Sequence, residues 1–264
     1  MANHLFCLQG DLRLLTCDAW LLPTDARGYV MSTWRPLLSP DVFYSPRRLD
    51  RSFWPTSHLR SRALPPQSPS QPVPWATLTG ASQREGEWYA DGAAEFVREA
   101  GGVLSAEADP DRPQSPRRRV ISGRSRPLIA LPVVGTGTGG KYSAAGEVIR
   151  PLLRRIAEVL ASPHLHIDVA IVAWDPDIYA GLQAERRRMR DEGVLAWPAL
   201  SKQQRDHAAE LARLAVAGDL VVFVGAGVSM GAGLPGWEAL LAALWKDLAD
   251  RPDAATVSKL GLLD

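Results

Sequence analysis

Two glycine-rich turns hold the residues of this 264-residue chain that are best suited to chemistry. Residues 135–141 (GTGTGGK) follow the apolar run 128–134, and residues 225–229 (GAGVS) follow the apolar run 220–224. A helical pattern comes after each turn. Backbone N–H groups in a glycine turn between a buried strand and a helix can approach a phosphate closely. The sequence therefore predicts two nucleotide-phosphate sites, and the alternative is two tight turns without a ligand.

The elements that must position these turns alternate along the chain. Four apolar runs predict buried strands, at residues 5–8, 19–22, 128–134 and 167–174. Helical spacing of apolar residues predicts helices over residues 88–100, 148–160 and 178–190. This alternation favours a parallel, three-layer α/β domain. We place it at residues 1–198, with an insertion rich in Pro, Arg and Trp over about residues 27–75, and a second domain at residues 199–264.

Composition excludes several classes of protein. Basic and acidic residues nearly cancel, 30 against 29, so total charge gives no case for a nucleic-acid partner. Two cysteines are too few for a disulfide scaffold and form no metal pair. No run is long enough to span a membrane, and no signal peptide is evident. We expect a soluble protein of a reducing compartment, the cytoplasm, without a metal site.

The insertion itself interleaves arginine with tryptophan, including Trp34, Trp54 and Trp75. Such interleaving is found in nucleic-acid-binding surfaces. The alternative is an irregular segment whose aromatic side chains anchor it to the domain. The neutral total charge favours the second interpretation, so nucleic acid is not an expected partner.

Three segments of the first domain resemble the macro domain family, which binds ADP-ribose. Residues 10–25 (GDLRLLTCDAWLLPTD) are similar to its opening, 131–140 (LPVVGTGTGG) to its phosphate loop, and 167–179 (IDVAIVAWDPDIY) to its closing strand. The resemblance covers about residues 5–195 without the insertion. It implies that Asp18 contacts the adenine. It also implies that a loop holds the diphosphate, and its residues are Gly135, Thr136, Gly137, Thr138, Gly139 and Gly140.

Two departures qualify this interpretation. Thr24-Asp25 stands where hydrolytic macro domains carry an Asn-rich segment, so the resemblance implies binding without hydrolysis. The same glycines also nearly fit the P-loop of an NTPase, from Gly135 to Lys141. In that interpretation Asp175, which follows an apolar strand, stands where the Walker B aspartate would lie. A P-loop needs Ser or Thr after the lysine to hold Mg²⁺, and Tyr142 stands there. The macro-like interpretation is favoured, and the P-loop remains an alternative.

The second glycine turn, followed by residues 233–237 (GLPGW) and an amphipathic helix, resembles the first NAD-binding motif of the sirtuin family. The resemblance covers about the last sixty residues and implies the first β–α unit of a Rossmann-like fold with NAD as cofactor. The residues it implies around the NAD are Gly225, Ala226, Gly227, Ser229, Leu234 and Pro235. A dehydrogenase fingerprint is weaker, because no second strand with an acidic residue follows about twenty positions on.

The Asn motif and the base His of sirtuins have no counterpart before Asp264, so we assign no catalytic residue and expect this chain to be inactive toward NAD. One hypothesis is therefore a parent protein that consumes NAD, as hydrolase or deacylase, and carries an ADP-ribose-sensing module. The other is a non-catalytic module that binds ADP-ribose or a related nucleotide. A strand and helix in about sixty residues lack enough neighbours to bury them, so we also expect self-association through residues 199–264.

Overall fold

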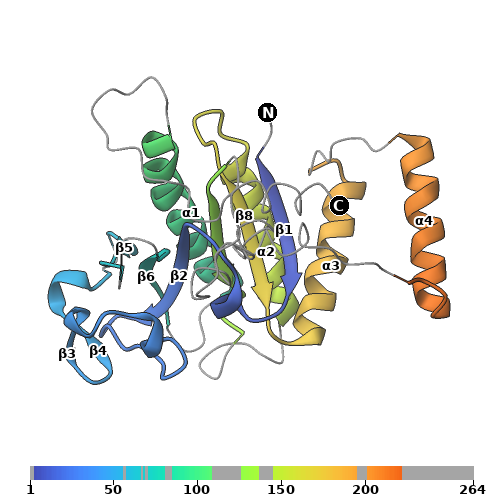
Figure 1. Cartoon of the computed structure of the whole chain (residues 1–264). Coiled ribbons are helices and arrows are strands. Elements are labelled where there is room, and N and C mark those ends of the chain that lie inside the picture. Colours follow the sequence, from blue (N-terminus) through green and yellow to red (C-terminus); the bar gives the residue numbers. More distant parts are fainter. Residues whose placement is uncertain are drawn as a thin grey trace, which may run out of the picture. The chain divides into compact units, whose positions relative to one another are not determined.

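The structure is a computed structural model that describes residues 3–55, 58–66, 68, 71–80, 85–108, 126–136, 145–194 and 201–221. The chain divides into two compact units, residues 1–196 and residues 197–264. The larger unit contains a six-stranded sheet with helices on one of its faces (Figure 1).

The sheet of the first unit has the strand order β1-β8-β7-β2-β6-β5. Its first five strands are parallel: β1 (His4–Gln9), β8 (Asp168–Ala173), β7 (Leu128–Pro132), β2 (Ala19–Asp25) and β6 (Val73–Gly80). Only β5 (Ser61–Ala63), at one edge, is antiparallel to its neighbour. The carboxyl ends of all five parallel strands therefore meet at one edge of the sheet, as the predicted α/β class requires.

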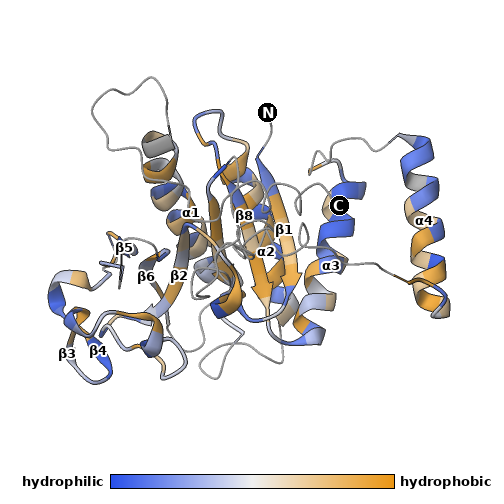
Figure 2. Cartoon of the chain, viewed as in Figure 1, coloured by the Kyte–Doolittle hydropathy of each residue, from blue (hydrophilic) through white to orange (hydrophobic). Residues whose placement is uncertain are grey.

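The central strands are apolar on both faces because alternate side chains enter two separate cores. In β2, Leu21 belongs to the first core and its neighbours Trp20 and Leu22 to the second. In β8, Ile171 enters the first core and Val172 the second. Figure 2 shows β1 and β8 as largely hydrophobic. A strand buried on both faces has a continuous apolar sequence, which is why these strands were predictable.

Three helices cover the first core. They are α1 (Gly86–Ala108), α2 (Ala145–Leu160) and α3 (Pro176–Asp191). Helix α2 places seven buried apolar residues on one stripe: Val148, Ile149, Leu152, Leu153, Ile156, Val159 and Leu160. Its other side carries charged residues, so the helix is strongly amphipathic, as its sequence predicted.

The insertion covers the second core and takes the place of a helical layer. It contains short 3₁₀ turns, η2 (Arg35–Leu37), η3 (Pro40–Val42) and η4 (Arg51–Phe53), and the hairpin β3 (Phe43–Ser45) and β4 (Arg48–Leu49). Trp34 packs on Trp20 with ring centroids 5.5 Å apart, and Trp54 packs against the same core. The anchoring role expected of the aromatic side chains is confirmed for these two tryptophans.

Two features of the fold differ from the expectation. The strand β5 lies inside the segment of about residues 27–75 that was expected to be irregular, and β6 begins at its end; β6 was missed because it contains Pro74 and threonines. The first helix was expected to end at Gly101-Gly102, but α1 continues to Ala108. A Cβ on Gly101 would lie 2.7 Å from Cδ1 of Ile167, so this glycine allows close packing rather than ending the helix.

In the second unit, the described residues form α4 (Lys202–Ala217). Ser201 and Gln204 make a reciprocal capping box at its start, and Gly218 ends it with φ +79°. Among the helices that the structure describes, none is long and apolar enough to cross a membrane.

Both cysteines are free and buried in the first unit, Cys7 in the first core and Cys17 in the second. Burial raises the pKa of Cys7 to about 11, and burial together with the neighbouring Asp18 raises that of Cys17 further. Because the thiolate is the reactive form, we predict that a thiol-specific disulfide reagent at about pH 8 modifies neither in the native protein.

Denaturant should expose both thiols to stoichiometric reaction. A Cys17→Ala variant serves as the control that assigns any slow native reaction to Cys7. Rapid modification of the native protein, at the rate of the unfolded chain, would contradict the burial of the two side chains.

Candidate functional site

The candidate site lies at the carboxyl edge of the sheet, where four turns leave neighbouring parallel strands. Gly10-Asp11 follows β1, Trp174-Asp175 follows β8, Gly135-Thr136 follows β7, and the insertion follows β2. The N–H of Gly10 donates to the carbonyl of Ala173 at 2.9 Å, which ties the first two turns together. In open α/β sheets this edge is the usual place for a ligand.

The turn after β7 requires glycine at its first position. Gly135 has φ +79°, a left-handed conformation that only glycine adopts at low cost. A Cβ there would also lie 2.7 to 3.0 Å from three atoms of the Tyr89 ring, and that ring is 1% exposed. The Thr136 hydroxyl closes the turn by donating to the carbonyl of Val133 at 2.8 Å. Gly137, Thr138, Gly139 and Gly140 lie outside the described residues.

Asp18, expected beside an adenine, lies elsewhere. It precedes β2 and is therefore at the amino edge of the parallel strands, opposite the glycine turn. Its carboxylate is 3% exposed and accepts a hydrogen bond from the backbone N–H of Leu128 at 2.7 Å. A buried carboxylate satisfied in this way joins β2 to β7, so the adenine role assigned to Asp18 is wrong.

Two other aspartates do lie at the carboxyl edge. Asp11 accepts hydrogen bonds from Nε of Arg13 at 2.9 Å, and these bonds lower the pKa of the carboxyl below its usual value. Asp25 accepts from the backbone N–H groups of Arg27 and Tyr29, both at 2.8 Å. Asp11 remains ionised at neutral pH, and Asp25 fixes the path from β2 into the insertion.

Trp174 is the feature of this edge that sequence reasoning missed. It was included in the buried strand 167–174, but β8 ends at Ala173 and Trp174 is 73% exposed. An indole in water at a sheet edge offers a flat face on which a planar base can stack. The signal in the sequence was the position of this tryptophan, last in an otherwise aliphatic run and directly before Asp175-Pro176.

Asp175 has a structural role that weakens the P-loop alternative. Its Oδ1 caps α3 by accepting from the N–H groups of Asp177 at 2.7 Å and Ile178 at 3.2 Å. An acid used as a helix cap is less available to position Mg²⁺. Among the residues that the structure describes, no group of three His, Cys, Asp or Glu side chains is placed to hold a metal ion.

A cavity of about 840 Å³ opens between the amino ends of α1 and α2 and the side of α3 from Asp177 to Arg188. Its described charged lining contains five carboxylates and two arginines: Glu85, Glu87, Glu147, Asp177, Glu185, Arg150 and Arg188. The helix dipoles favour an anion here, but this excess of carboxylates opposes one. We therefore place the phosphate-binding candidate at the glycine turn and not in this cavity.

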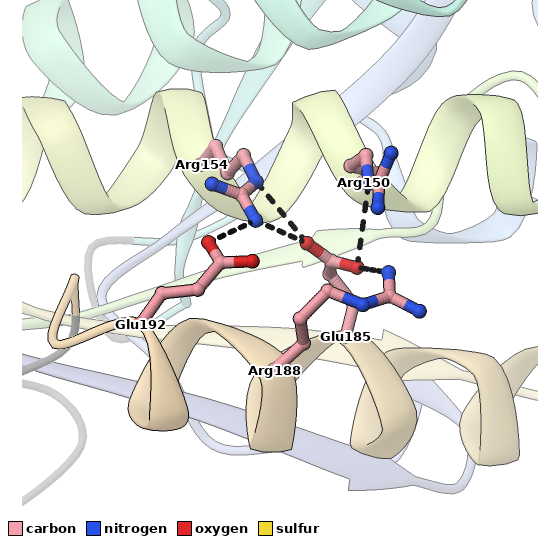
Figure 3. A network of polar contacts seen from close by, with 5 residues as sticks. All are labelled: Arg150, Arg154, Glu185, Arg188 and Glu192. Atoms are coloured by element: carbon pink, nitrogen blue, oxygen red, sulfur yellow. Dashed lines mark hydrogen bonds and ion pairs between the residues drawn. The ribbon is translucent and has the colours of Figure 1, made fainter.

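One wall of the cavity is held by a buried acid. Figure 3 shows the Glu185 carboxylate, from α3, directed toward arginines of α2. Glu185 is 4% exposed, and it lies 3.1 Å from Nη2 of Arg154 and 3.7 Å from Nε of Arg150. Arg188 forms a third ion pair with it. Glu192 accepts from Arg154 at 2.6 Å, and this bond raises the pKa of Arg154. The network joins α2 to α3.

The residues expected to hold NAD, 225–235, lie outside the described part of the chain. The structure therefore does not bring Gly225, Ala226, Gly227, Ser229, Leu234 or Pro235 together with any other residue. They remain predictions from the sequence.

The fold of the first unit is similar to that of solved macrodomains, although no family model and no curated protein matches the chain. A variant of the Oceanobacillus iheyensis macrodomain with ADPR bound is similar at 12% identity and a TM-score of 0.50, over 72% of this chain and 95% of that one. Another variant of that macrodomain matches at 13% identity and a TM-score of 0.50, over 72% of this chain and 90% of that one.

A Trypanosoma brucei macrodomain in complex with ADP-ribose shows 14% identity and a TM-score of 0.45, over 69% of this chain and 68% of its own. Because the Oceanobacillus structures share only 12% and 13% of their residues with this chain, their similarity concerns the fold alone. The chain has a mixed α/β, three-layer fold like that of macrodomains, as predicted. None of these similarities includes a sirtuin domain, so the Rossmann-like unit expected after residue 198 gains no support.

We predict that Gly135→Ala destabilises the first unit by about 2 kcal/mol or more. The left-handed backbone costs a non-glycine residue about 1 kcal/mol or more, and the Tyr89 ring has no space to move away. The free energy of unfolding from urea titration measures the loss. Gly146→Ala is the control: an added Cβ there has nothing within 4 Å, and alanine is favoured over glycine in a helix, so no loss of stability is expected. A Gly135→Ala variant as stable as this control would contradict the turn geometry.

Glu185→Gln is expected to cost about 1–3 kcal/mol of stability, because three guanidinium groups lose the carboxylate that they share and, among the described residues, only Arg154 keeps another, that of Glu192. This range lies below that for a fully buried pair because the arginines are partly exposed. Glu192→Gln, whose parent side chain is 43% exposed, should cost under about 1 kcal/mol. Urea titrations at low and high salt compare them, and equal losses would refute the central role of Glu185.

Proposed function

We propose that the first unit binds ADP-ribose at the carboxyl edge of its sheet and does not hydrolyse it. The observation that carries the proposal is the pair of features at that edge: the left-handed glycine turn at Gly135 and the exposed indole of Trp174. A glycine turn before a helix suits a diphosphate, and an exposed indole suits a nucleobase. ADP-ribose contains both groups.

Two further observations support this ligand. A solved macrodomain with ADPR bound is among the proteins of similar fold. The strand order brings the turns after β8 and β7 next to each other, because these strands are hydrogen-bonded neighbours. One ligand can therefore contact Trp174 with its base and the residues from Gly135 to Gly140 with its diphosphate.

Absence of hydrolysis is proposed from the turn after β2. Asp25 stands at the position of the Asn-rich segment that the macro resemblance would require, and its carboxylate Oδ1 is engaged by two backbone N–H groups. A side chain fixed to its own turn is poorly placed to activate a water molecule at the ligand.

Calorimetric titration of the full chain with ADP-ribose tests the proposal. Trp174→Ala should weaken binding by about 1–3 kcal/mol, or about 5- to 150-fold in Kd, through loss of stacking. Gly137→Val should also weaken it, because the added side chain blocks the backbone from the diphosphate. The control is Tyr44→Ala, which removes another exposed aromatic ring, 61% exposed and on the insertion.

Binding unchanged in Trp174→Ala and Gly137→Val would exclude this site. Tighter binding of Mg-ATP than of ADP-ribose would favour the P-loop alternative. Release of ADP-ribose from a modified peptide by the wild-type chain would show that the module is hydrolytic.

A second part of the proposal rests on the sequence alone. Residues 199–264 are proposed to contain the first NAD-binding motif of a protein that consumes NAD. The support is the motif of residues 225–229 and the Leu234-Pro235 pair after it. In a calorimetric titration with NAD, a binding signal that disappears in Gly227→Val and persists in Trp174→Ala would assign NAD to this second site. Heat lost only in Trp174→Ala would assign it to the first.

A further inference from the structure

The insertion carries a concentration of positive charge that the neutral total conceals. Residues 26–66 contain seven arginines and two aspartates, a net charge of +5 in a chain whose net charge is +1. This segment contains no lysine. Arg60 turns inward, 4.4 Å over the Trp88 ring of α1. We call the other six the insertion arginines: Arg27, Arg35, Arg47, Arg48, Arg51 and Arg62.

The insertion arginines are not neutralised by neighbouring acids. Within the described ranges, none of the six forms an ion pair with a carboxylate. Arginines of the helical layer behave differently, since Arg154, Arg155 and Arg188 all pair with glutamates or aspartates. Asp50 is occupied as the cap of η4. The positive charge of the insertion is therefore available to a partner.

Backbone pairing gathers the segments that carry several of these arginines into one small module around β3 and β4 (Figure 1). Tyr29 lies opposite Arg48 in an antiparallel bridge, and the N–H of Val30 donates to the carbonyl of Arg47 at 2.9 Å. Arg35 donates to the carbonyl of Pro46 at 3.0 Å, at the turn of the same hairpin.

Arg51 and Arg62 join this module from η4 and β5. Arg51 lies 5.8 Å from the centroid of the Trp54 ring, and Arg62 donates to the carbonyl of Ser52. Tyr44 and Tyr29 add aromatic surface among the guanidinium groups, with exposed fractions of 61% and 39%. Charge and exposed aromatic rings thus share the module.

We propose that the basic insertion binds single-stranded nucleic acid. Guanidinium groups match phosphate oxygens in a bidentate manner, and they stack on flat rings. Exposed tyrosines provide stacking faces for bases, which are accessible in a single strand and covered in a duplex. The total charge argued against such a partner only because the acidic residues lie on other parts of the chain.

An anionic membrane surface fits the module less well. Membrane adsorption needs apolar side chains that can enter the lipid beside the basic ones. Four aliphatic residues of the insertion, Val30, Leu38, Val42 and Leu49, face the second core instead and are at most 3% exposed. Besides its tyrosines, the most exposed large apolar side chains on the described part of the insertion are Met31 and Leu59, at 42% and 39%, which is little apolar surface for entering lipid. The module is therefore better suited to bind phosphate groups at its surface than to enter a lipid layer. Its exposed aromatic rings favour a nucleic acid over other polyanions.

Fluorescence anisotropy of the full chain with labelled RNA and DNA single strands of about 16 nucleotides tests the proposal. We expect binding that weakens as salt rises from about 50 to about 200 mM, with about 0.7 in logarithmic slope for each phosphate contact. Arg47→Ala/Arg51→Ala should weaken binding tenfold or more and reduce the slope by about 1.4. Tyr44→Ala should weaken it about fivefold or more.

The matched control is Arg155→Ala/Arg190→Ala, which removes two exposed arginines that are paired with acids. It should change affinity less than twofold, and all variants should keep the wild-type melting temperature. No binding at about 50 mM salt, or an equal loss in the control, would overturn the proposal. A duplex bound more tightly than either single strand, or binding to anionic phosphatidylserine vesicles alone, would also overturn it.

The outcome is separable from that of the ADP-ribose site. Arg47→Ala/Arg51→Ala should keep the calorimetric response to ADP-ribose, and Trp174→Ala should keep the anisotropy response to single strands. Loss of both responses in either variant would mean that the two surfaces are one site, which contradicts their proposed independence.

Discussion

The central strands of this protein are apolar on both faces, and this constraint organises everything around them. Trp20 and Leu21 are adjacent in sequence, yet they enter different cores on opposite sides of the sheet. Two layers of covering are therefore required, and the chain supplies them in different ways. Regular helices cover one face, while a segment with little regular structure covers the other. The cavity among α1, α2 and α3 lies in the helical layer, and the arginine-rich surface lies in the insertion, so both follow from this unequal division.

Much of the fold could be predicted because buried parallel strands and amphipathic helices have simple sequence patterns. The strands β1, β2, β7 and β8 and the helices α2 and α3 lie close to the expected residues. β6 could not be recognised, since Pro74 and its threonines give it neither an apolar run nor a clean alternation. Gly101 led to a wrong helix end because it serves a tertiary contact: it allows α1 to approach Ile167. The spacing of residues along the helix does not reveal that contact.

The candidate site was predictable at its glycine turn and not at its other members. A strand followed by GTG indicates the turn, and the left-handed Gly135 agrees with it. Asp18 was misassigned because a single sequence does not tell a carboxylate that meets a ligand from one that ties two strands together. Trp174 was missed for a similar reason. Its exposure depends on β8 ending one residue earlier, which is decided by pairing with β1 and β7.

The residues of the insertion have different roles on its inner side, which faces the second core, and on its outer side, which faces solvent. Val42 and Leu49 are buried in the second core, whereas Tyr44 and Arg47 are exposed. Substitutions at outward positions therefore carry little folding penalty, and those at inward positions carry a large one. Among relatives, such a segment can exchange its surface chemistry rapidly while the framework beneath it stays fixed. Sequence divergence concentrated at its outward positions would then mark changes of partner rather than loss of constraint.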